Sequence, residues 1–136
     1  MSGTETLIID EWLTESLAGI TGVTGVYEGL APVDAPYPFI VFQYQSSYDS
    51  TGMGPSARIM IDADYIVRVI TESASFADME TIAEAIDTAI EGQSGSVTGG
   101  VVLGVARKEQ YRDVEQYQNQ TIRHLGGRYR IVAQGL

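Results

Sequence analysis

Two parts of the chain repeat apolar residues at helical spacing. The first runs from about Thr4 to Ala18, where Ser2 and Glu5 have the spacing of a capping box. The second begins at Ser75, which precedes Asp78 by three residues, and ends at Gly92. The apolar stripes of these two predicted helices are Ile9, Trp12, Leu13, Leu17 and Ile20 in the first, and Met79, Ile82, Ala83, Ile86, Ala89 and Ile90 in the second.

Other segments alternate or cluster their apolar residues as strands do. The clearest is Arg58 to Thr71, in which every second residue from Ile59 to Val69 is apolar. A continuous apolar run follows three prolines and predicts a buried strand from Pro38 to about Tyr48, because proline favours extended geometry in the residue before it. The remaining predicted strands are Val26 to Glu28, a strand containing Val101, Leu103 and Val105, and Thr121 to Gln134.

Polar and glycine-rich segments separate these elements. Asp49 to Ala57 and Gln93 to Gly100 have the composition of loops. Residues 110–120 are a polar connection between two long strands, and a hairpin of about 10 residues per strand projects roughly 30 Å, beyond its own core. We therefore expect this hairpin to contact another subunit.

The order helix, strand, strand, strand, helix, strand, strand predicts an α+β fold. One mainly antiparallel sheet would carry both amphipathic helices on one face. With 136 residues, the chain is expected to form a single domain over residues 1–136.

The charge is strongly acidic and unevenly distributed. The net charge is −10, with 15 acidic residues against Arg58 and Arg68 in residues 1–91, and six basic against three acidic residues in the remainder. An acidic surface disfavours binding to DNA phosphates. It can line a channel through which DNA slides without sticking, or it can simply keep the protein soluble.

The sequence offers little for catalysis or metal binding. There are no cysteines, and His124 is the single histidine. We interpret His124 as structural, and Asp62 and Asp64 as a surface paired with Arg68 rather than as a cation site or an acid and base pair. The glycine-rich segments lack the ending of a phosphate loop. We predict no catalytic residue, no metal and no cofactor, and the chain has neither the pattern of a signal peptide nor an apolar run long enough for a membrane span.

Tyrosines and arginines in the second half are candidates for a subunit seam. Tyrosine is favoured at protein interfaces because its ring is apolar and its hydroxyl is polar. Arginine can pair with the acidic part of a neighbouring copy. The seam residues that we predict are Arg107, Tyr111, Arg112, Tyr117, Arg128 and Arg130.

Ser46 to Ala57 is a second candidate interface. It is rich in serine and glycine, with Tyr48 and Met53 as its main apolar residues, so we expect it to be mobile in the isolated protein and to dock on a partner. The alternative is a surface insertion that the fold tolerates and that has no binding role. The candidate contact residues are Ser46, Tyr48, Asp49, Met53 and Pro55.

Several segments together resemble the tail-terminator (tail-completion) family of phage and prophage proteins. They are the Val26 to Gln43 stretch with its Pro-x-Pro-Phe-Ile-Val-Phe strand, the Ile-Ala-Glu-Ala-Ile-Asp helix, and the closing Gly-Gly-Arg-Tyr-Arg-Ile-Val strand. The resemblance implies a small α+β subunit of a hexameric ring at the head-proximal end of the tail tube. Such a ring stops tube polymerisation and joins the tail to the head-completion protein, with DNA only passing through its lumen.

This resemblance implies a location in the neck or tail of the virion, in the host cytoplasm during assembly, and not at a membrane. The loop from Ser46 to Ala57 would then dock on the tail tube or on a neighbouring ring. Three alternatives stay open: an acidic DNA mimic that inhibits a nucleic-acid enzyme, another neck or head-completion component, and a small hydrolase built on Asp62, Asp64 and His124.

Overall fold

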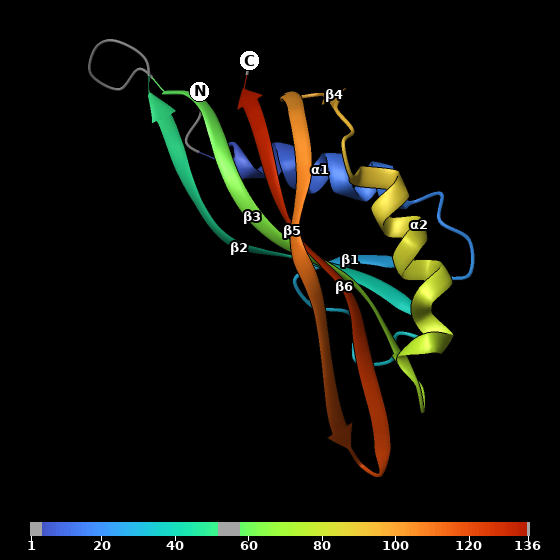
Figure 1. Ribbon diagram of the computed structural model, residues 1–136. Helices are drawn as coiled ribbons and strands as arrows, with labels where there is room; N and C mark the ends of the chain where they lie inside the picture. The colour runs from blue at the N-terminus through green and yellow to red at the C-terminus, as the bar shows by residue number, and fades with distance from the viewer. Residues whose placement is uncertain (1–3, 52–57, 136) are drawn as a thin grey trace.

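The computed structural model describes residues 4–51 and 58–135, which form one sheet with helices packed against it (Figure 1). In chain order the elements are α1 (Thr6–Leu17), β1 (Val26–Glu28), β2 (Phe39–Thr51), β3 (Arg58–Glu72), the 3-10 helix η1 (Phe76–Met79), α2 (Glu80–Ile90), β4 (Gly95–Val97), β5 (Gly100–Tyr117) and β6 (Gln120–Gly135). The predicted α+β class is therefore correct, and the predicted order lacks η1 and β4.

The sheet is mixed, with the strand order β1-β2-β3-β6-β5-β4. The strands of the pair β1 and β2 run parallel, and those of the other neighbouring pairs run antiparallel. The prediction missed β4 because this strand is marked by backbone pairing of Gly95–Val97 with residues 100–102, and not by any apolar pattern. Short strands of this kind carry almost no sequence signal.

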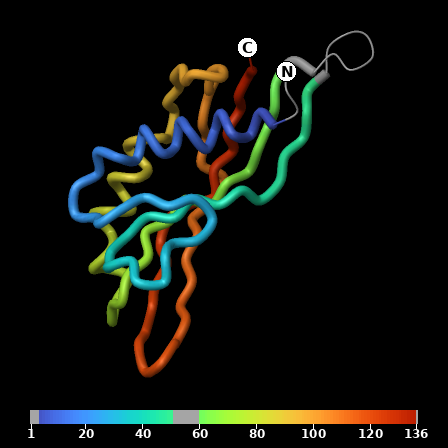
Figure 2. Tube along the Cα trace, turned by 180° about the vertical axis from the view of Figure 1, so that it is seen from behind, coloured from blue at the N-terminus to red at the C-terminus, as the bar shows by residue number. Residues whose placement is uncertain are grey.

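Both helices pack on the same face of the sheet, where they form the main core. Figure 2 shows α1 lying across the strands. Trp12, Leu13 and Leu17 from α1 meet Ile86 and Ile90 from α2 in one buried cluster. The sheet contributes the residues that alternate along its strands, including Ile40, Phe42, Ala63, Tyr65, Val67, Val69, Val105, Tyr129 and Ile131. The predicted helix stripes and the apolar face of β3 are thus confirmed.

The opposite face carries a small apolar cluster under the proline-rich connection. Phe39 and Val41 of β2 lie there with Ile70 and Ile122. The ring of Phe39 stacks on the ring of Tyr37, with 5.4 Å between the ring centres, and meets the ring of Tyr27 edge-on at 5.8 Å. This connection therefore closes one end of the face, and the rest of the face stays open.

The helix boundaries differ slightly from the prediction. The predicted capping box includes Ser2, which lies outside the described residues, and Glu5 occupies the N-cap position without a side-chain cap hydrogen bond. At the second helix Ser75 does cap, because its hydroxyl accepts a hydrogen bond from the Ala77 amide at 3.1 Å. That cap begins η1, and α2 itself starts only at Glu80.

Strands extend into two segments that the sequence predicts as connections. Asp49 to Thr51 belong to β2, so the predicted loop from Asp49 is wrong over these residues, and residues 52–57 lie outside the described part of the chain. Residues 110–117 continue β5, which leaves only Gln118 and Asn119 as the turn before β6. Both turn residues have positive φ, of 50° and 66°, as a tight two-residue hairpin requires. The polar composition of residues 110–117 reflects exposure and not a loop.

Candidate assembly surfaces

Charged side chains of neighbouring strands pair across the sheet face opposite the helices. The best satisfied is Asp62 on β3, which is only 7% exposed. Its two oxygens accept hydrogen bonds from Nε of Arg130 at 3.0 and 2.8 Å, and a further one from Nη2 of the same arginine. The hydroxyl of Tyr48 donates to Asp62 at 2.8 Å. The hydrogen bond from Arg130 lowers the pKa of Asp62, so this carboxylate stays charged at neutral pH.

Two more ion pairs continue this row. Lys108 Nζ lies 3.2 Å from Asp64, and Arg128 Nε lies 3.3 Å from Glu109. We call the three pairs, Asp62 with Arg130, Asp64 with Lys108 and Glu109 with Arg128, the open-face ladder. The prediction that Arg68 pairs with Asp62 and Asp64 is wrong, because β6 and β5 supply the partners.

Arg68 instead belongs to a network farther along the same face. Its Nε donates to Nδ1 of His124 at 3.1 Å, and Nε2 of the same imidazole lies 2.9 Å from Glu115. With Nδ1 accepting, the imidazole carries its proton on Nε2 and donates to the carboxylate. The Arg68 guanidinium also lies 5.7 Å from the ring centre of Tyr111. Burial lowers the pKa of Arg68. His124 is buried and held on both sides, which fixes the orientation of its ring and agrees with the interpretation of a structural histidine.

Charge is divided between the layers of the fold. The helices α1, η1 and α2 carry acidic residues and no basic residue of their own, namely Asp10, Glu11, Glu15, Asp78, Glu80, Glu84 and Asp87. The eight basic residues all lie on β3, β5 and β6. The unevenness seen along the sequence is therefore a difference between an acidic helical layer and a sheet that carries all the basic residues.

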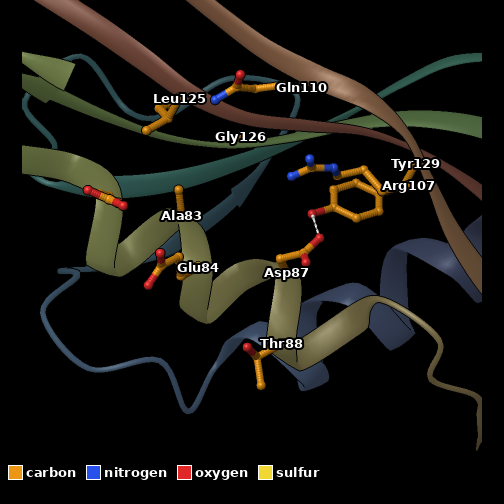
Figure 3. A pocket seen from close by; sticks show the side chains of 10 residues that line it. Ala83, Glu84, Asp87, Thr88, Arg107, Gln110, Leu125, Gly126 and Tyr129 are labelled. Atoms are coloured by element: carbon orange, nitrogen blue, oxygen red, sulfur yellow. Dashed lines mark hydrogen bonds between the residues drawn. The ribbon is translucent and has the colours of Figure 1, made fainter. Parts of the chain in front are cut away.

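A groove of about 390 Å³ separates α2 from β5 and β6 (Figure 3). Glu80 and Glu84 line its helical side, and Arg107 and Gln110 line the opposite side. The hydroxyl of Tyr129 donates to Asp87 at 2.9 Å and ties the sheet to the helix. None of the residues that line the groove is a histidine, so it lacks the usual general base of nucleophilic catalysis.

The β5–β6 hairpin projects from the sheet as an arm (Figure 1). At its base, the ring of Phe76 packs against two guanidinium groups, those of Arg112 at 5.3 Å and Arg123 at 4.8 Å. Beyond this anchor, Val114 is 45% exposed and Tyr117 is 63% exposed. The prediction of a long projecting hairpin is thus confirmed, and its contact with another subunit stays a prediction.

The predicted seam residues are distributed over both faces of the arm. Arg107 and Arg112 point to the helix side, as their pairing with Tyr129 and Leu125 indicates. The other four, Tyr111, Tyr117, Arg128 and Arg130, lie on the open face. Several already have partners within the chain, since Arg128 and Arg130 belong to the open-face ladder. These two arginines are consequently weaker candidates for a seam than the exposed tip.

The structure places part of the predicted docking segment in a strand. Ser46, Tyr48 and Asp49 lie in β2, and Tyr48 is held by Asp62 within the same chain. Met53 and Pro55 lie outside the described residues. The expectation of a mobile segment is therefore wrong for Ser46 to Thr51, because backbone pairing with β3 orders this polar sequence within its own chain.

Sequence reasoning missed a polar contact beneath α1. The hydroxyl of Tyr65 donates to Oδ1 of Asp10 at 2.6 Å. Burial raises the pKa of Asp10 from its usual 3.8 to about 6, and the neighbouring carboxylate of Glu28 adds to the rise. The only sequence signal was an acidic residue one position after the apolar pair Ile8 and Ile9, which looks like an ordinary exposed helix position.

Comparison with protein families identifies the group to which this architecture belongs. A family model described as tail completion protein gp17 matches residues 9–132. The chain belongs to this family. Its members are structural proteins of phage tails, so the protein is a tail completion protein and not an enzyme. The resemblance that the sequence carried is confirmed.

A solved structure of the same fold agrees with this membership. The chain is similar to a protein in the virion of a native gene transfer agent particle, with 18% identity, a TM-score of 0.68, and coverage of 98% of this chain and 100% of the other. No curated protein sequence matches the chain. In the described part of the tail completion protein, no cluster of three or more acidic or histidine side chains could hold a metal, and no helix is long and apolar enough to cross a membrane.

Proposed function

We propose that this tail completion protein forms a ring on the head-proximal end of a phage-type tail tube. The ring would end tube polymerisation and join the tail to the head-completion protein. The observation that carries this proposal is the family match, which spans residues 9–132 and therefore both helices and nearly the whole sheet. The hexameric state comes from the resemblance in the sequence.

The surface chemistry supports a role in assembly. The fold exposes apolar side chains on the connection between β1 and β2, on β2 and at the tip of the arm, namely Leu30, Val33, Tyr44 and Tyr117. Tyrosine in particular is favoured at protein interfaces, because its ring is apolar and its hydroxyl is polar. The acidic helical layer suits a surface near passing DNA, because it offers phosphates no attractive site.

Microscopy of the purified protein tests this proposal directly. We expect negative-stain images to show rings with a central hole, and mass measurement in solution to give about six times the 14.7 kDa chain mass. Adding the protein to polymerising tail tube protein should shorten the tubes and leave rings at one end only. A protein that stays monomeric at all concentrations, with or without tube protein, would contradict the proposal.

The acidic helical layer also keeps the DNA-mimic alternative testable. A mimic needs its carboxylates exposed on a monomer or dimer, whereas a ring needs self-association. Competition with DNA for a nucleic-acid enzyme, observed with a protein that does not form rings, would favour the mimic. The other alternative, a different component of the neck, predicts rings that bind the head-completion protein without shortening tail tubes.

A further inference from the structure

The outer edge of β5 is covered along one half and open along the other. In the covered half, the Gly92 amide donates to the Val105 carbonyl at 2.8 Å, and the Arg107 amide donates to the carboxylate of Glu91 at 2.6 Å. The backbone groups of residues 105 and 107 therefore point away from β6 and are satisfied by the end of α2. This is how a fold protects a sheet edge from unwanted pairing.

Beyond Lys108 this protection ends. A bulge there shifts the register by one residue. The residues whose backbone groups point away from β6 are therefore odd-numbered before the bulge and even-numbered after it. The Val114 amide confirms the change, because the side chain of Asp113 accepts its hydrogen bond at 2.9 Å. In the described part of the chain, no hydrogen bond reaches the outward backbone groups of Gln110, Arg112 and Gln116. An edge of about 20 Å is thus left with unpaired donors and acceptors.

The other side of the sheet has a matching open edge on β2. There, β1 covers only the beginning of the strand, through the Ile40 amide and the Phe42 carbonyl. A bulge after Tyr44 shifts the register, so that the backbone groups of Ser47 and Asp49 point away from β3. These groups also have no partner in the described residues. The sheet therefore has one open stretch at each side, and Figure 1 shows them at opposite ends of the molecule.

We propose that the open stretch of β5 in one copy adds to the open stretch of β2 in the next copy, as an antiparallel strand pair with Arg112 opposite Asp49. This inference rests on the proposed ring and names its seam. Strand direction supports it: β5 runs antiparallel to β2 within one sheet, because three antiparallel pairings separate them. A neighbour whose strands keep this direction presents the edge of its β2 antiparallel to β5. A head-to-tail contact of unlike edges closes into a ring where the rotation between successive copies closes.

Charge supports the proposed register. Asp49 pairs with Ile61 and Arg112 pairs with Leu125, and both apolar partners face the helices. In a continued sheet the acidic and the basic side chain would therefore share one face, directly opposite each other, which is a favourable cross-strand pair. Ser47 would lie opposite Val114.

The same register keeps the covered parts of both edges out of the contact. With Arg112 opposite Asp49, the β2 residues that pair with β1 lie beyond the position opposite Tyr117, where β5 of the neighbouring copy ends. The β5 residues that Glu91 and Gly92 cover fall past Thr51, where β2 ends. The two open stretches thus match in direction, in charge and in extent.

The absence of cysteine makes this seam accessible to cross-linking. Two single variants, Ser47→Cys and Val114→Cys, are mixed and oxidised, because opposed residues of an antiparallel pair have Cα atoms close enough for a disulfide. We expect a dimer of the two unlike chains. The control is Ser47→Cys mixed with Ala106→Cys, whose cysteine lies in the covered half of β5. The chain carrying both Ser47→Cys and Val114→Cys should give a series of cross-linked oligomers that ends at the number of subunits in the ring.

Charge reversal tests the register independently. Arg112→Glu and Asp49→Arg should each weaken self-association by about tenfold or more, and the double variant should recover most of the loss, as a directly coupled pair does. Near-native circular dichroism of each variant shows whether the fold is intact. Rings without a cross-link above the Ala106→Cys control overturn this seam and leave the proposed ring standing. Cross-linked products that stop at two copies overturn the head-to-tail arrangement. Absence of any self-association overturns both the seam and the ring.

Discussion

The two faces of the sheet are stabilised by different interactions. On the helix side, side chains such as Trp12, Tyr65 and Ile131 are buried in one apolar core. On the open side, the same strands present the open-face ladder, in which Asp62 is buried only because Arg130 and Tyr48 hydrogen-bond to it. The helix side depends on the area removed from water, and the open side depends on which residues stand opposite each other.

The largest expected effect comes from the helix side. Trp12→Ala removes a ring that is 5% exposed and packs near β4, so it should lower the free energy of unfolding by about 3–5 kcal/mol. Leu7→Ala is the matched control on the same helix, because Leu7 is 57% exposed, and it should cost at most about 0.5 kcal/mol. Chemical denaturation of both variants measures this. Equal losses would show that α1 does not pack through the face that carries Trp12.

This difference between the faces also explains how far the sequence predicted the structure. Apolar spacing located α1, α2 and the core face of β3, because burial is encoded residue by residue. It could not locate the partners of Asp62, which are 14 residues before and 68 residues after it in the chain. Those depend on the register between strands.

The polar strands follow the same logic. Residues 110–117 look like a loop because both faces of the arm are exposed beyond the sheet. They are ordered by backbone pairing with β6, which leaves no trace in composition. The open edges of β2 and β5 could likewise not be predicted, because they depend on bulges after Tyr44 and near Lys108.

A smaller effect is expected on the open side. Asp62→Asn keeps the shape of the side chain and removes its charge, so it should cost about 1–2 kcal/mol, less than a fully buried pair because the Arg130 side chain is 53% exposed. Asp64→Asn is the matched control, because the Asp64 side chain is 27% exposed where that of Asp62 is 8% exposed, and it should cost below about 0.5 kcal/mol. Thermal unfolding at pH 7 measures both. A larger loss for Asp64→Asn would show that the ladder does not order its pairs by burial.

The dependence on pH has a defined sign for Asp62. Its pKa is lowered in the folded protein, so the stability that it contributes is present above the ordinary value of 3.8 and is lost as pH falls through the lowered value. Stability measured below pH 4 should therefore fall less steeply in Asp62→Asn than in the unaltered protein. Parallel curves for the two proteins would contradict the role of Arg130 in holding this carboxylate charged.

The smallest expected effect has the opposite sign and belongs to the helix side. The pKa of Asp10 is raised to about 6 because burial beside Tyr65 disfavours its charge, and Glu28 adds repulsion. A carboxylate with a raised pKa favours folding fully below about pH 4, and this contribution is lost as pH rises from 3.8 through 6. A pKa difference of about two units between the folded and the unfolded protein corresponds to about 3 kcal/mol of folding stability, and solvent screening of this half-buried group reduces it to about 1 kcal/mol.

Asp10→Asn keeps an acceptor for the Tyr65 hydroxyl without the charge, so it should be about 1 kcal/mol more stable than the unaltered protein at pH 8 and about equal to it at pH 4. Urea denaturation at the two pH values decides this, with Glu11→Asn on the same helix as the control. A gain at pH 8 that persists at pH 4, or one that Glu11→Asn reproduces, would assign the effect to general charge reduction and not to the contact beneath α1.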